Sequence, residues 1–228
     1  MSDLEELIRV LPMVGAESSI LDDTNIAHVV AHGHHILSHR TVPGLRVNME
    51  ETPDAIIGKM IIDAGVTIAQ PIHMCFGLAH PTGVQQIKID VQVNEGAQAR
   101  VLSHCLFPFA KAAEHRMQAV MTIGPGASLT YTEGHYHGPH GGMQVLPHAT
   151  IKIGKGARYF SDFSLLSGSA GNLDIDYHVE VDGHYYSVPH SLVRRTVEAR
   201  ITDYTVEILH GGSRVACHAR PLSKRRHT

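Results

Sequence analysis

Tryptophan is absent from this 228-residue chain, and aromatic residues make up only 5% of it. Its three cysteines, Cys75, Cys105 and Cys217, cannot form an even disulfide framework, which favours a reducing compartment. A formal net charge of −3 disfavours nucleic-acid binding as the main role. No apolar run approaches membrane-spanning length, and the N-terminus is acidic rather than signal-like. We therefore expect a soluble cytoplasmic protein that binds neither nucleic acid nor membrane.

A short motif recurs along the chain at a spacing of 30 residues. It reads apolar-x-apolar-x-x-Gly-small, and its clearest copies contain Gly96, Gly126 and Gly156. Weaker copies contain Gly65 and Gly183. A fixed period in the range of about 20–50 residues is typical of a solenoid, in which each repeat forms one structural unit.

Residues around these glycines alternate between apolar and polar, as between Ala97 and Phe107. A period of two predicts β-strands, and the glycines supply tight turns between them. No long amphipathic helix pattern separates the repeats, so a βαβ arrangement is disfavoured. The pattern predicts an all-β solenoid, a β-helix with one coil per repeat, in which equivalent residues stack at about 4.8 Å.

Three regions follow from this pattern. Residues 1–25 are expected to form an N-terminal helical cap, residues 26–185 the β-helix core, and residues 186–228 a divergent C-terminal segment. Within the core, residues 106–117 read as a longer excursion or a short helix. In the last segment, residues 196–209 read as one further strand pair.

The repeat places Cys75, Cys105 and His135 at 30-residue intervals, which would form a ladder of possible metal ligands. Thiolates favour zinc and iron–sulfur species, and imidazole suits iron and zinc. Counted from the preceding turn glycine, however, Cys75 lies one position out of step. That would reverse its face unless a bulge near Pro71 corrects it, so Cys105 and His135 are the better pair. Cys105 could equally pack as a small apolar side chain.

Histidine is over-represented, with 19 residues. His135, His137 and His140 form an H-x-H-x-x-H sequence in a glycine-rich stretch, and Glu133 shares the inward parity of His135. A buried glutamate needs a partner or a metal. Either this part of the strand leaves the interior at the edge of the coil, or it forms a polar site inside it. A nucleophilic pair of Cys105 with His135 is also conceivable, whereas His104 should face the other way.

Four stretches, PIHMCFG, SHCLFPFA, YTEGHYHGPHGG and GNLDIDYHVEVDG, resemble the SufB/SufD family, in particular its stand-alone SufBD-type members. The resemblance covers about His28 to Gly183. It implies a right-handed parallel β-helix and a scaffold role in iron–sulfur cluster assembly. It also implies a SufC-like ATPase and a SufB/SufD-like homo- or heterodimer partner. Family members continue the β-helix into a C-terminal helical region, whereas here the pattern stops near His184, so the chain is C-terminally shortened or divergent.

The leading hypothesis is a scaffold that is not itself an enzyme and that carries a transient iron–sulfur cluster. Cys105, with Cys75, would accept sulfur or hold iron. The candidate metal ligands are His135, His137, His140, Glu133 and His73. Two alternatives stay open: a metal-dependent enzyme that uses the His135/His137/His140 cluster, and a structural β-helix without a ligand.

Overall fold

A computed structural model describes residues 3–14, 16, 18–167, 170–173, 176–181, 184–186, 197–201, 205–210 and 212–219. Gly183, which ends the weakest copy of the motif, lies outside these ranges. The chain begins with helix α1 (Asp3–Val10) and two short 3-10 helices, η1 (Leu11–Val14) and η2 (Ser18–Leu21). All further described elements are strands.

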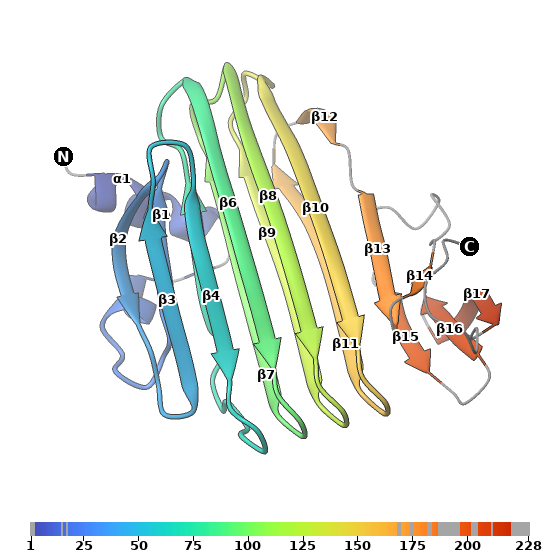
Figure 1. The fold of residues 1–228 in the computed structure, drawn as a ribbon. Helices are drawn as coiled ribbons and strands as arrows, with labels where there is room; N and C mark the ends of the chain where they lie inside the picture. Colours follow the sequence, from blue (N-terminus) through green and yellow to red (C-terminus); the bar gives the residue numbers. More distant parts are fainter. Residues whose placement is uncertain are drawn as a thin grey trace.

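The strands form two sheets that lie face to face (Figure 1), and we call the interior between them the lumen. In the first sheet the order is β17 (Ser213–Ala219), β16 (Thr205–His210), β15 (Val197–Ile201), β11 (Arg158–Ser167), β9 (Ser128–His137), β7 (Gln98–Phe107), β5 (Ile72–Gly77), β1 (His28–His32) and β2 (His35–Arg40). In the second sheet it is β14 (His184–Tyr186), β13 (Asp176–Val181), β10 (Met143–Ile153), β8 (Ala112–Ile123), β6 (Thr82–Val93), β4 (Ile56–Ile62) and β3 (Leu45–Glu51). A short strand, β12 (Ala170–Leu173), also pairs with β10.

Each coil contributes one strand to each sheet, and successive coils pair in parallel. The architecture is the expected right-handed parallel β-helix. Gln98 pairs with Ser128, and Ser128 with Arg158, so the register equals the 30-residue spacing of the motif. The repeat glycines Gly96 and Gly126 have φ of 67° and 66°, in the left-handed region where a side chain is strained.

Two local expectations have different outcomes. The stretch 106–117 contains no helix, because β7 runs to Phe107 and β8 begins at Ala112 after a tight turn. The short-helix alternative is therefore wrong. The strand pair expected at 196–209 is confirmed, since β15 and β16 pair antiparallel and β15 also pairs with β11.

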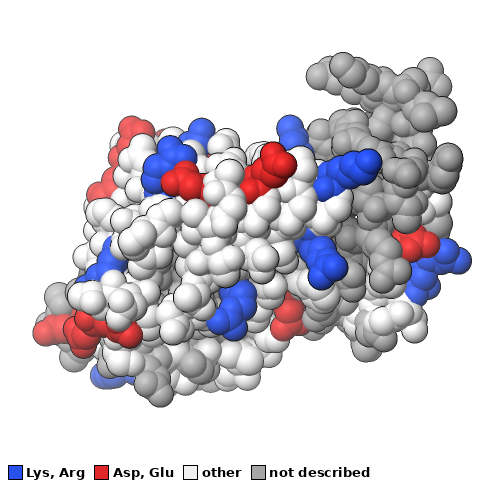
Figure 2. All heavy atoms as spheres, turned by 90° about the horizontal axis from the view of Figure 1, so that it is seen from below, with Lys and Arg blue, Asp and Glu red and all other residues white. Residues whose placement is uncertain are grey.

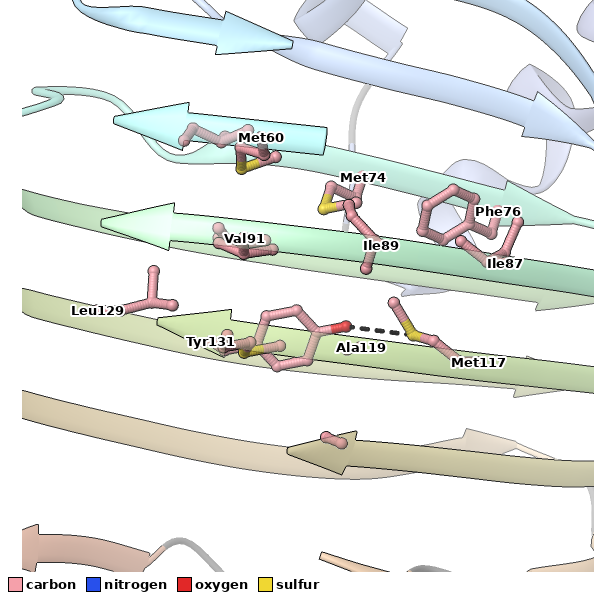
Figure 3. Packing of buried hydrophobic residues seen from close by; sticks show 14 of the residues in the cluster. Met60, Met74, Phe76, Ile87, Ile89, Val91, Met117, Ala119, Leu129 and Tyr131 are labelled. Atoms are coloured by element: carbon pink, nitrogen blue, oxygen red, sulfur yellow. Dashed lines mark hydrogen bonds between the residues drawn. The ribbon is translucent and has the colours of Figure 1, made fainter. Parts of the chain in front are cut away.

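The lumen is filled mainly by aliphatic side chains and methionine. Figure 3 shows Met60, Met74 and Met117 extending into this space from different strands. Tyr131, also buried, places its hydroxyl 3.8 Å from the sulfur of Met117. Aliphatic and methionine side chains fill the narrow gap between the two sheets, which fits the low aromatic content of the chain.

The N-terminal helices cover the outer face of the first sheet. Leu7 and Leu11 pack there against Val30, Cys75 and Leu106 in a separate buried cluster. A strand contributes alternate residues to its two faces, so Cys75 faces this cap while its neighbours Met74 and Phe76 face the lumen. The N-terminal segment thus closes a second, smaller core.

A pair of histidines lies on the same outer face. His73 Nδ1 is 3.0 Å from His104 Nε2, and the two rings stack with their centroids 5.3 Å apart. Burial lowers the pKa of both groups, and burial together with the neighbouring His73 lowers the pKa of His104 to about 4. The folded protein therefore holds this pair with fewer protons than the unfolded chain does.

Charged side chains are interspersed on the face of the molecule drawn in Figure 2, where Lys and Arg alternate with Asp and Glu. The described residues on this face form no basic stripe of the kind that tracks a nucleic-acid backbone. Among the described residues, no helix has the length and apolarity required to span a membrane.

Close backbone stacking gives a first prediction. A Cβ at Gly138 would lie 1.8 Å from the Pro108 carbonyl oxygen, whereas a Cβ at Gly126 would meet nothing within 4 Å. We expect Gly138→Ala to lower the free energy of unfolding by more than about 3 kcal/mol, because the turn must move. Gly126→Ala should cost about 1–2 kcal/mol, from its positive φ alone. Urea titrations compare the two variants, and equal losses would contradict the described packing of this turn.

The His73–His104 pair gives a second prediction. Because the folded pKa of both groups lies below 6.5, the unfolded chain binds more protons as the pH falls, and stability must fall with it. We expect a lower free energy of unfolding at about pH 5 than at about pH 7.5, and a smaller difference in His104→Gln. The exposed His140→Gln variant is the matched control. A pH dependence that is unchanged in His104→Gln would contradict this account.

Candidate metal centre in the lumen

Four possible metal ligands of three chemical kinds, a thiol, a carboxylate and two imidazoles, meet inside the β-helix. Cys105 lies on β7, His115 on β8, and Glu133 and His135 on β9. Each residue offers one ligand atom, and these atoms all lie within 4.8 Å of one another. None of the four residues is more than 3% exposed. Side chains alternate between the two faces of each strand, and all four of these residues take positions whose side chains face the lumen.

The contacts within the group are short. Cys105 Sγ lies 3.8 Å from Glu133 Oε1 and 3.9 Å from His115 Nε2. His135 Nε2 lies 2.6 Å from the same Glu133 oxygen. One carboxylate oxygen thus accepts hydrogen bonds from both a thiol and an imidazole, at the centre of the group.

Burial and mutual contact set the protonation of the group. Burial, followed by the negative charge of Glu133, raises the pKa of the Cys105 thiol well above its usual value. Burial lowers the pKa of His115 to about 3, so this ring is neutral. Burial also opposes ionisation of Glu133, but the hydrogen bond and charge of His135 outweigh it and lower its pKa. The group therefore holds an anionic carboxylate beside a protonated thiol.

A further histidine supports the group from the same strand. His137 Nε2 lies 3.2 Å from His135 Nδ1, and His137 is also buried. The ring of Phe107 packs against the rings of His115, His135 and His137, with centroids 5.1–6.0 Å apart. The imidazole of His135 is thus held on both of its nitrogen atoms.

Two buried polar atoms beside the group have no hydrogen-bond partner. They are His115 Nδ1 and Gln85 Oε1, and these two residues pair directly in the second sheet. The Gln85 amide nitrogen is fixed by the carbonyl oxygens of Gly33 and Gly77, at 3.1 and 2.8 Å. An unpaired buried polar atom is costly, and these two atoms are complementary, because Gln85 Oε1 can accept a hydrogen bond from a protonated His115 Nδ1.

The structure brings together only some of the residues expected from the sequence. Cys105 pairs with His135, as the repeat indicates. Cys75 does not join them, because β5 and β7 pair with an offset of 29 residues, which places Phe76 beside Cys105 and Cys75 beside His104. A shift of one residue reverses the face of a strand. The predicted ladder of Cys75, Cys105 and His135 is therefore wrong. The sequence already indicated this, because Cys75 lies one position further from its preceding turn glycine than Cys105 and His135 do from theirs.

Of the other expected ligands, some lie in the lumen and some lie outside it. Glu133, His135 and His137 lie inside the lumen, so the alternative in which this part of the strand leaves the interior is wrong. His73 lies on the outer face with His104, which confirms that His104 faces away from Cys105. His140 is exposed in the turn after β9. The H-x-H-x-x-H sequence therefore does not form one site.

His115 is the ligand group that sequence reasoning missed. Its lumen-facing parity is visible in the sequence, since Ala113, His115, Met117 and Ala119 alternate with polar residues. The interpretation of residues 106–117 as an excursion or helix hid this alternation.

The fold and this site define a parallel β-helix with a luminal thiol, carboxylate and imidazole group, and the comparisons with known proteins identify its relatives. An iron–sulfur cluster assembly SufBD family protein of Methanocaldococcus jannaschii is 30% identical over 184 residues, 78% of this chain and 58% of that protein. Another, from Pyrococcus horikoshii, is 26% identical over 174 residues, 76% of this chain and 52% of that protein. These matches confirm the resemblance of the chain to SufBD family proteins over about three quarters of its length. It spans a little over half the length of these relatives.

The C-terminal part has a second relationship. The family model described as Mu transposase, C-terminal domain, matches residues 164–228. A putative transposase for insertion sequence IS408 from Burkholderia multivorans is 68% identical over 56 residues, 25% of this chain and 11% of that protein. The segment 186–228, expected to be divergent, falls within the matched range. No solved structure matches the chain.

Burial of both described thiols gives a third prediction. Desolvation raises the pKa of Cys75 to about 12 and that of Cys105 higher than normal. In a Cys217→Ser background treated with chelator, both thiols should react with Ellman's reagent at least about 100-fold more slowly than in the guanidinium-unfolded chain. Rapid labelling of Cys105 in the folded protein would contradict its placement in the lumen.

Proposed function

We propose that the β-helical part of this chain takes part in iron–sulfur cluster assembly by holding iron through Cys105. One observation carries the proposal: the luminal thiol of a SufBD-related β-helix contacts a carboxylate and an imidazole, the groups that bind iron together with thiolate. The relationship to proteins named for iron–sulfur cluster assembly supplies the process.

Of the two roles considered for Cys105, the geometry favours iron over sulfur. A sulfur acceptor must be an accessible thiolate, whereas this thiol is fully buried and its pKa is raised. The adjacent Glu133 carboxylate repels anionic sulfide species and attracts a cation. A metal ion instead deprotonates the thiol that it binds.

The wider role rests on the family relationship. We propose a scaffold component rather than an enzyme, which acts in the cytoplasm with a SufC-like ATPase and a SufB/SufD-like partner. Iron held through Cys105 would be transient cargo, passed on to an iron–sulfur cluster that is assembled elsewhere. Burial of the luminal group favours this role over catalysis, because a small-molecule substrate needs access to the reacting atoms.

Iron delivery tests the proposed function. Protein loaded anaerobically with ferrous iron and freed of excess metal is mixed with sulfide and an apo-ferredoxin, and cluster formation in the ferredoxin is followed by circular dichroism. The wild-type protein should supply iron, and Cys105→Ala should lower the amount of iron supplied by about tenfold or more, because a ligand is lost.

Cys75→Ala is the matched control, since it also removes a buried cysteine, but from the outer face of the sheet. It should deliver iron as the wild type does. Equal delivery by wild type and Cys105→Ala, with both proteins folded by far-ultraviolet circular dichroism, would reject the proposed function.

A further inference from the structure

We propose that Cys105, His115, Glu133 and His135 form a closed, four-coordinate site for a single divalent transition-metal ion, which zinc occupies in preference to iron. The inference deepens the proposed function, and it rests on that function in treating iron as the cargo. It adds the stoichiometry, the coordination and a competing ion.

The size of the group fits one ion. Ligand bonds of about 2.0–2.3 Å in a tetrahedron place the ligand atoms about 3.3–3.8 Å apart. The two sulfur contacts measure 3.8 and 3.9 Å, and all four ligand atoms lie within 4.8 Å of one another. The 2.6 Å contact between Glu133 and His135 must lengthen when an ion replaces the proton that joins them, and any pair of ligand atoms near the 4.8 Å limit must shorten by about 1 Å. Shifts of less than about 1 Å therefore complete the site.

The donor set selects the class of ion. One thiolate, two imidazoles and one carboxylate are borderline ligands that suit zinc and ferrous iron, whereas calcium and magnesium require oxygen ligands. Multi-iron clusters are usually held by several cysteine thiolates. Here Cys105 is the one sulfur ligand of the group, and the donors are close together. The site therefore fits one ion better than a cluster.

Two neighbours of the site act as its supporting shell. Metal-bound histidines usually pass their second ring N–H to a hydrogen-bond acceptor, which fixes the tautomer. His137 Nε2 is placed to accept this bond from His135 Nδ1. If His115 binds the ion through Nε2, its Nδ1 carries the proton, and the neighbouring Gln85 supplies an oxygen that otherwise has no partner. The orphaned atoms thus fit the metal-bound form.

The site also joins the two walls of the β-helix. Cys105, Glu133 and His135 belong to the first sheet, and His115 belongs to the second. An ion bound to all four links these sheets across the lumen, so binding must stabilise the folded state by mass action. The affinity order for divalent ions places zinc above ferrous iron, so zinc is expected to displace iron from this site.

Cobalt(II) is the probe for the coordination. Chelator-treated protein is titrated anaerobically with cobalt(II), and absorption spectra are recorded. We expect saturation at one ion per chain, with the intense visible bands of four-coordinate cobalt and a near-ultraviolet thiolate charge-transfer band. Zinc should abolish these bands, raise Tm and stop iron delivery to the ferredoxin.

Conservative variants localise the site. Cys105→Ser should lose the charge-transfer band, while Cys75→Ser and His140→Ala should keep the wild-type spectrum. His137→Gln should weaken cobalt binding by about 10–100-fold without changing the ligand set. This variant retains all four ligands, so it tests the supporting shell even if a ligand variant fails to fold.

The outcomes separate this inference from the proposed function. Stoichiometric cobalt binding that depends on Cys105, without iron delivery, would support the site and reject the delivery role. Iron delivery by a protein that binds no four-coordinate cobalt, or that binds several irons per chain, would overturn the single-ion site and leave the delivery role standing. A charge-transfer band retained in Cys105→Ser would also overturn the site.

Discussion

Parallel pairing of successive coils in register is the constraint on which the structure depends. Because side chains alternate between the two faces of a strand, two strands paired one residue out of the 30-residue spacing hold residues 30 positions apart on opposite faces. The 30-residue offset between β7 and β9 places Cys105 beside His135, whereas the 29-residue offset between β5 and β7 places Cys75 on the opposite face. Register therefore decides which of two buried cysteines can meet a metal and which packs beneath the N-terminal cap.

The luminal group shows how polar chemistry can be held in an apolar interior. Glu133 would be costly to bury alone, and its contacts with His135 and Cys105 reduce that cost. Phe107 and the strands around it fix the rings without competing for their nitrogen atoms. The result is a buried set of possible metal ligands, beside which His115 Nδ1 and Gln85 Oε1 are a complementary donor and acceptor.

The architecture was largely predictable from the sequence, because a solenoid repeats the same local pattern in each coil. Glycines at constant spacing and apolar residues at alternate positions indicated the coil length, the turns and many lumen-facing residues, including Cys105. They showed that Glu133 shares the parity of His135, but they did not decide whether this part of the strand stays inside the lumen. His115 was not predicted, because residues 106–117 were interpreted as an excursion or a short helix and not as the end of one strand and the start of the next. The position of Cys75 depended on the length of an irregular coil, and the contact between His115 and Cys105 depends on packing across two sheets. Neither is encoded in the local pattern of a single strand.

The pairing of β15 with β11 has a broader consequence. Phe160 and Ser161 of the β-helix pair with Glu198 and Val197, which lie in the range matched by a transposase domain model. The hydrogen bonds of a β-sheet join backbone N–H and C=O groups, and every residue except proline has both. The edge strand of a coil can therefore pair with a strand of any evolutionary origin. A solenoid built from nearly identical coils can thus be joined to an unrelated sequence at one strand without disturbing the coils before it. Each coil contacts only its neighbours, so coils far from such a junction, including those that carry Cys105 and His135, can retain their structure and their side-chain contacts.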